Sequence, residues 1–219
     1  SAIMAIYDSA MPTATAPTRT GCTFAGYWDA VSGGTQYYTN SMVSSRTWDK
    51  TTAYTLFARW TVTVTLNKNG GTGGTNSVIA TYGSPMPTAT APTRTGYTFA
   101  GYWDATSGGT QYYTNTMGSA NNWNKTNNTT LYARWTGNQY TVTFDKQLGT
   151  GGTNSVTATY DSTMPTATAP TRTDYTFNGY WDAVSGGNQY YNSSMASVRN
   201  WDKTNNATLY ARWTGNQYT

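Results

Sequence analysis

Apolar and polar residues alternate with a period of two along most of the chain, which predicts strands rather than helices. In the run 140–144, a tyrosine, a valine and a phenylalanine alternate with threonines, and a second alternating run covers 156–160. A glycine-rich turn at 148–152 separates the two runs. This pattern predicts a β-hairpin.

The same reasoning places three further elements after this hairpin. A strand at 175–177 follows Asp174, where a left-handed turn is expected because Gly21 and Gly96 occupy the matching positions. The runs 179–183 and 189–191 flank a Ser-Gly-Gly loop and predict a second hairpin. A last strand covers 208–213, with Leu209, Ala211 and Trp213 on one face.

Two segments do not fit a strand pattern. Residues 164–173 carry prolines, so we expect extended or polyproline-like backbone there and no central strand. Residues 193–201 are expected to contain a helical turn.

The chain contains three copies of one unit. The string Met-Pro-Thr-Ala-Thr-Ala-Pro-Thr-Arg-Thr begins at Met11, Met86 and Met164, and tryptophans recur at the same spacings. Three extra residues follow Trp135, where Thr-Gly-Asn-Gln-Tyr replaces the abrupt Thr61-Val62 junction. A unit of this length can close its own core, so we expect tandem domains connected like beads on a string. The expected boundaries are 1–60, 61–135 and 136–213, and 214–219 begins a further repeat.

Composition excludes many kinds of chemistry. The 219 residues include no His and no Glu, and Cys22 is the only cysteine. A Ser-His-Asp or Cys-His site, a His-ligated metal and a cysteine-based zinc site are therefore impossible, and we expect no catalytic residues, no metal and no cofactor. The net charge of +4 comes from singly spaced Lys and Arg, and no apolar run is long enough to span a membrane, so we expect neither nucleic-acid binding nor membrane insertion.

Three stretches of the second copy resemble a known family. Residues 92–105 read Pro-Thr-Arg-Thr-Gly-Tyr-Thr-Phe-Ala-Gly-Tyr-Trp-Asp-Ala, residues 107–112 read Ser-Gly-Gly-Thr-Gln-Tyr, and residues 131–135 read Leu-Tyr-Ala-Arg-Trp. The succession is similar to the Listeria–Bacteroides repeat, the B-repeat of internalin B, and covers the chain three times. The resemblance implies a mainly β fold (α+β, β-grasp-like small domains) in long bacterial surface proteins, and no enzymatic activity.

One departure from the family pattern singles out three tryptophans. These copies have Gly-Tyr-Trp where the family has Gly-Trp-Tyr, and exchanging neighbours on a strand exchanges the ring that faces the core. Either the register shifts by one residue, or these tryptophans lie outward. The candidate surface or ligand contacts are therefore Trp28, Trp103, Trp181, Tyr38, Tyr113 and Tyr191.

The leading functional hypothesis is a structural stalk or spacer in an extracellular, adhesin-like and possibly fibre-forming cell-surface protein. Its partners would be neighbouring repeats and, in some settings, other copies of the chain or a host or cell-surface glycan or protein. The alternative is a carbohydrate- or surface-binding module that uses exposed Trp and Tyr rings.

The first copy differs from the third at its start. Ser1 aligns with Asn154, so the first copy has no counterpart of the strand and turn at 140–153. A sheet without one strand exposes an edge that invites pairing. Either a strand from a preceding segment or a neighbouring molecule's tail completes this copy, or the copy is simply frayed.

Overall fold

The computed structural model describes residues 2–219, and no helix is present among them. The chain forms two compact units. The first comprises the residues up to Thr93 together with Phe99–Arg134, and the second comprises Arg94–Thr98 together with Trp135–Thr219.

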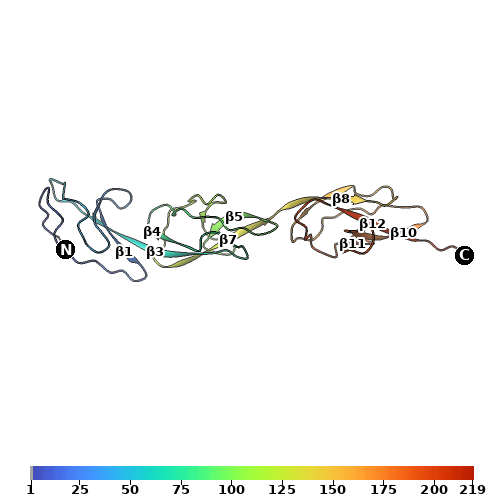
Figure 1. Ribbon diagram of the computed structural model, residues 1–219, viewed down its shortest axis with the longest axis horizontal. Helices are drawn as coiled ribbons and strands as arrows, with labels where there is room; N and C mark the ends of the chain where they lie inside the picture. The colour runs from blue at the N-terminus through green and yellow to red at the C-terminus, as the bar shows by residue number, and fades with distance from the viewer. Residues whose placement is uncertain (1) are drawn as a thin grey trace. The chain divides into compact units, whose positions relative to one another are not determined.

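The first unit is built around one sheet that carries most of the first two repeats (Figure 1). Its strands follow the order β2-β1-β3-β7-β5-β6, and β4 pairs with β3 off this path. Their bounds are Thr23–Trp28 (β1), Gln36–Tyr38 (β2), Phe57–Asn67 (β3), Ser77–Thr81 (β4), Tyr97–Trp103 (β5), Gln111–Tyr113 (β6) and Thr129–Gly137 (β7).

The long strand β3 passes from the first repeat into the second without a break at Trp60. Its first half pairs antiparallel with β1, and its second half pairs antiparallel with β4 and parallel with β7. The first strand of the second repeat thus continues the last strand of the first.

The second unit holds the third repeat in a five-stranded sheet of order β11-β10-β12-β8-β9. The bounds are Gln139–Asp145 (β8), Ser155–Thr159 (β9), Tyr175–Trp181 (β10), Gln189–Asn192 (β11) and Ala207–Gly215 (β12). Strands β8 and β9 form the first predicted hairpin, and β10 and β11 form the second. Both hairpin predictions are confirmed.

A β-bulge decides which aromatic rings enter the core. The register between β10 and β12 shifts between Phe177 and Gly179, so Phe177 and Tyr180 reach the same face although they are three residues apart. The rings of Phe177 and Tyr180 meet edge to face, with their centres 5.2 Å apart. The matching rings of the second repeat, Phe99 and Tyr102, do the same at 5.3 Å. The tryptophan that follows then lies on the outer side of the strand and is half-buried.

The core of the third repeat consists of aromatic and aliphatic residues from all five strands and the loops between them. Its buried members are Val142, Phe144, Ala158, Met164, Phe177, Tyr180, Tyr190, Tyr191, Met195, Trp201, Leu209 and Ala211. One buried cluster of the first repeat contains Met11, Tyr37, Tyr38 and Trp48, and Phe24 of β1 is also buried. Tyrosine and tryptophan thus supply core volume that aliphatic residues supply in most domains.

The expectation of mainly β repeats is confirmed, whereas the helical component of an α+β, β-grasp-like unit is absent from residues 2–219. The helical turn expected at 193–201 is wrong, because turns and isolated bridges occupy that segment. The proline-bearing residues 164–173 form no strand, as predicted, although Thr171 and Arg172 make isolated bridges. Asp174 adopts the expected left-handed turn with φ 64°.

Candidate functional site

One polar cluster recurs in the hairpin loop of every repeat. The aspartate that opens the loop accepts a hydrogen bond at Oδ1 from the backbone N–H six residues later, at 2.6, 2.7 and 2.7 Å. Its Oδ2 forms a salt bridge with a lysine at 3.1, 2.9 and 2.8 Å. The three pairs are Asp29–Lys50, Asp104–Lys125 and Asp182–Lys203.

An arginine from the last strand of each repeat completes this loop cluster. In the third repeat, the Arg212 guanidinium donates to the carbonyl oxygens of Ala183, at 3.0 Å, and Gly186. The same guanidinium lies 4.5 Å from the centre of the Trp181 ring. Arg59 with Trp28 and Arg134 with Trp103 repeat the arrangement at 4.5 Å. The arginine therefore ties the loop to the sheet and packs against the tryptophan.

The contacts within the cluster favour the ionised aspartate and the protonated lysine. The Thr35 amide and then the Lys50 ammonium hold the pKa of Asp29 below its usual value. The hydrogen bond to Asp29 raises the pKa of Lys50 in turn. An ammonium held charged is no nucleophile, and a carboxylate held ionised is a poor proton donor near neutral pH. The loop cluster stabilises a turn and has no features of an acid–base site.

The tyrosines among the candidate residues lie in the core. Tyr38, Tyr113 and Tyr191 are 2%, 0% and 0% exposed. Their hydroxyls donate to the carbonyl oxygens of Pro12, Pro87 and Pro165 at 2.6, 2.7 and 2.6 Å. Each tyrosine thus fastens a proline-bearing segment to the second hairpin. Of the six candidates, only the three tryptophans reach the surface.

A second recurring carboxylate position also has a structural partner. Tyr37 and Tyr190 donate their hydroxyls to Asp49 and Asp202, and Tyr112 donates to Asn124 at 2.6 Å. An amide oxygen accepts this hydrogen bond as a carboxylate does, which explains why the middle repeat can carry asparagine.

The residues that sequence reasoning missed are arginines and glutamines. Besides the three arginines, Gln36, Gln111 and Gln189 donate through Nε2 to the carbonyl of the tyrosine two residues later at 3.0 Å. Both residue types recur at matching positions of all three repeats, in Ala-Arg-Trp and before Tyr-Tyr. That recurrence was the available signal.

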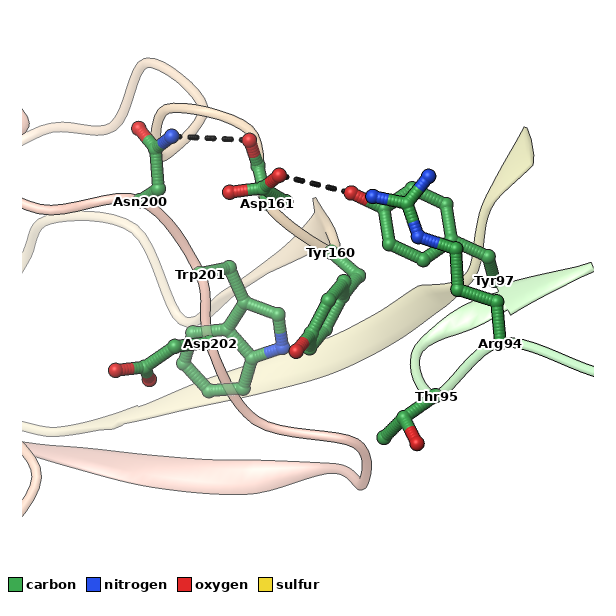
Figure 2. Close-up of a pocket in the computed structure, with 8 residues that line it drawn as sticks. All are labelled: Arg94, Thr95, Tyr97, Tyr160, Asp161, Asn200, Trp201 and Asp202. Carbon is green, nitrogen blue, oxygen red and sulfur yellow. Dashed lines mark hydrogen bonds between the residues drawn. The ribbon is translucent and has the colours of Figure 1, made fainter. Parts of the chain in front are cut away.

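The second unit also contains a pocket of about 250 Å³, shown in Figure 2. Tyr97 donates its hydroxyl to the Asp161 carboxylate at 2.8 Å, and the Asn200 amide donates to the Asp161 carbonyl at 2.9 Å (Figure 2). The lining residues are Arg94, Thr95, Tyr97, Tyr160, Asp161, Asn200, Trp201 and Asp202.

Internal contacts already involve several side chains of this pocket. The Arg94 guanidinium lies 4.0 Å from the centre of the Tyr97 ring, and Tyr97 packs edge to face on Tyr160 at 5.3 Å. At the matching positions of the first unit, Cys22 replaces the tyrosine and Gly83 replaces the aspartate. Cys22 Sγ donates instead to the Thr126 carbonyl at 2.8 Å. The tyrosine and the aspartate change together, as expected of a packing pair.

The described residues contain neither a cluster of metal-ligating side chains nor a membrane-spanning helix. No group of three or more His, Cys, Asp or Glu side chains within residues 2–219 is placed to hold a metal ion. In the same part of the chain, no helix is both long and apolar enough to cross a membrane.

Fold and site together define an all-β protein of tandem repeats that share one loop cluster. The model of the Listeria-Bacteroides repeat domain matches residues 4–58, 63–134 and 140–212. The chain belongs to this family, with three tandem copies.

The relatives found by sequence comparison are longer proteins. Internalin H of Listeria monocytogenes is 39% identical over 129 residues, which cover 58% of this chain and 21% of internalin H. A protein of Evansella cellulosilytica named as a membrane protein is 29% identical over 171 residues, covering 75% of this chain and 23% of that protein. The chain spans about a fifth of the length of these relatives. No solved structure matches it significantly.

Proposed function

We propose that this chain is a structural spacer, a stalk segment that holds other parts of a bacterial surface protein away from the cell. The observation that carries the proposal is the loop cluster, which is the same in all three repeats and in which the aspartate, the lysine and one terminal nitrogen of the arginine all make internal contacts. A spacer needs copies of one stable unit, whereas an enzyme needs a constellation of residues that is special to one site.

The family and the relatives support an extracellular place for this spacer. The chain belongs to the Listeria-Bacteroides repeat family, and its relatives include internalin H and a protein named as a membrane protein. On this proposal, other segments of such proteins carry out adhesion, and the repeats set the distance of those segments from the cell surface. Neighbouring repeats are the main partners of each copy.

The candidate residues give the carbohydrate-binding alternative little support. Sugar rings stack on open aromatic faces, but a guanidinium lies over each candidate tryptophan ring. The accompanying tyrosines are buried. No observation favours this alternative over the spacer.

Display of the repeats on a bacterial surface tests the proposal. Versions with one, two or three sets of this chain are placed between a membrane anchor and an epitope tag. The accessibility of the tag to a bulky antibody should rise with each added set. Trp103→Ala should leave that rise unchanged, because reach depends on folded length and not on a binding surface.

A ligand screen supplies the opposing outcome. The purified chain should show no saturable binding on a glycan array. Binding that Trp103→Ala, Trp28→Ala and Trp181→Ala each weaken would contradict the spacer and support the sugar-binding module. Tag accessibility that is independent of the number of sets would contradict the spacer as well.

A further inference from the structure

The first and last strands of the third repeat lie side by side and run in the same direction (Figure 1). Strand β8 pairs parallel with β12, and the register joins Val142 to Ala207 at one end. It joins Asp145 to Tyr210 at the other end. Because the strands are parallel, the start of β8 and the end of β12 lie at opposite ends of the pair. The chain enters the repeat at the first of these points and leaves it at the second.

The second repeat has the same arrangement. The second half of β3 pairs parallel with β7, from Val64 with Thr129 to Asn67 with Tyr132. Each of these parallel pairs, residues 142–145 with 207–210 and residues 64–67 with 129–132, is here called a terminal pair. In both repeats, the terminal pair joins the strand that opens the unit to the strand that closes it.

The terminal pairs lie within their sheets and over the core. In the third repeat, β9 flanks β8 on one side and β10 flanks β12 on the other. The register partners Phe144 and Leu209 are both buried, as are the partners Leu66 and Leu131 of the second repeat. Apolar side chains therefore keep water from the inward face of each pair, where it would otherwise compete for the main-chain hydrogen bonds.

An asparagine side chain extends each terminal pair by one contact. Asn206 Oδ1 accepts a hydrogen bond from the Thr141 backbone N–H at 2.9 Å, one residue before the paired segment begins. Asn128 Oδ1 accepts from the Thr63 backbone N–H at the same distance in the second repeat. Both asparagines are exposed, so neither fills the core. The contact joins the two strands at the end where the chain enters the pair.

We propose that the terminal pairs bear mechanical load and hold each repeat folded when the chain is pulled from its ends. Tension applied at the start of the first strand and the end of the last strand acts along the strands and shears the pair. All of its hydrogen bonds then resist together, whereas strands pulled apart from one end release their bonds one after another. Load bearing goes beyond the spacer function, since a spacer needs folded length and not resistance to tension.

Single-molecule force spectroscopy on the full chain tests the proposal with two directions of pulling. Cys22→Ser removes the native thiol. One protein then carries handles at Gln139→Cys and Gln217→Cys, which load the terminal pair of the third repeat in shear. A second carries them at Gln139→Cys and Asn205→Cys, which pull on the starts of both strands and peel the pair. All three handle positions are exposed.

The two pulling directions should give different unfolding forces although the folded structure is the same. At one loading rate, the force in shear should be at least about twice the force in peeling, because the bonds of the pair resist together only in shear. In shear, the repeat should open in a single step that releases about 200–250 Å of chain. Equal forces in the two directions, or a lower force in shear, would overturn the proposal.

Two variants of the shear protein test the asparagine contact. Asn206→Ala should unfold at least about threefold faster at a fixed force, because it removes one bond of the loaded pair. Asn205→Ala, at the exposed neighbouring position, should change this rate less than about 1.5-fold. Equal rates for the two variants would contradict a loaded terminal pair. Tag accessibility in the display experiment does not depend on these forces, so the spacer proposal and the load-bearing proposal fail separately.

Discussion

Individual tyrosines in this chain differ sharply in what their hydroxyl groups do. Tyr191 and Tyr180 are both 0% exposed and lie in the same core. The Tyr191 hydroxyl donates to the Pro165 carbonyl at 2.6 Å, whereas the buried Tyr180 hydroxyl has no hydrogen-bond partner within residues 2–219. The cost of removing each hydroxyl should therefore differ, although the two rings are equally buried.

We expect Tyr191→Phe to lower the free energy of unfolding by about 1–2 kcal/mol, because it leaves a carbonyl without its donor. Tyr180→Phe should change that free energy by less than about 0.5 kcal/mol, or raise it, because the hydroxyl it removes has no partner. Denaturant unfolding of the two variants beside the parent chain measures both effects. Equal losses in the two variants would contradict this account of the core.

At the scale of the element, the bulge in the strand before each hairpin loop depends on a glycine. Gly179 has φ 126°, and a Cβ atom there would lie 2.2 Å from the Tyr191 carbonyl oxygen. Gly186, in the loop of the same hairpin, has φ 66° and open space where its Cβ would be. A side chain at Gly186 would therefore cause backbone strain alone, whereas one at Gly179 would cause both backbone strain and steric overlap.

Gly179→Ala should destabilise the third repeat by at least about 2 kcal/mol, because it adds a clash to an unfavourable backbone conformation. Gly186→Ala should cost only about 1 kcal/mol, the penalty of a left-handed residue with a side chain. Thermal unfolding followed by circular dichroism compares the two. A Gly179→Ala variant as stable as Gly186→Ala would show that the bulge tolerates a side chain.

The strands and hairpins could be predicted from the sequence, since alternation sets a period of two and glycine-rich turns end each run. The bulge could not be predicted, because it changes which face of the strand a side chain occupies without breaking the strand. The Gly-Tyr-Trp sequence by itself is compatible with either register. The burial of Tyr38 was missed for a similar reason. Tyr37 and Tyr38 are neighbours on β2, yet both are buried, because Trp48 packs on one and the proline segment covers the other.

The role of the arginine in the loop cluster could not be predicted from the sequence pattern either. Arg59 and Ala30 are far apart in the chain and meet only because β3 and β1 pair. In the third repeat, alternation places Arg212 on the face opposite Leu209 and Ala211. It does not indicate which loop accepts hydrogen bonds from the guanidinium. Recurrence in three copies identifies such residues as important without identifying their partner.

At the scale of the whole molecule, both units rely on buried tyrosines, and this gives the chain a characteristic response to alkali. Burial raises the pKa of Tyr102, Tyr113, Tyr180 and Tyr191 from 10.0 to about 12. The folded state therefore holds these protons more tightly than the unfolded state does. Because the folded pKa is the higher one, the stabilising contribution is complete below pH 10 and is lost as the pH rises toward 12.

We therefore expect the unfolding temperature to change little between pH 6 and 9, a range in which no histidine can titrate because the chain has none. It should then fall steeply between about pH 10 and 12, as tyrosines ionise in the unfolded chain before they ionise in the core. Tyrosinate absorbance recorded during the same titration should show one group of tyrosines that ionises only as the fold is lost. A stable fold with every tyrosine ionised at pH 12, or a loss of stability that begins near pH 8, would contradict this tyrosine-based account of stability.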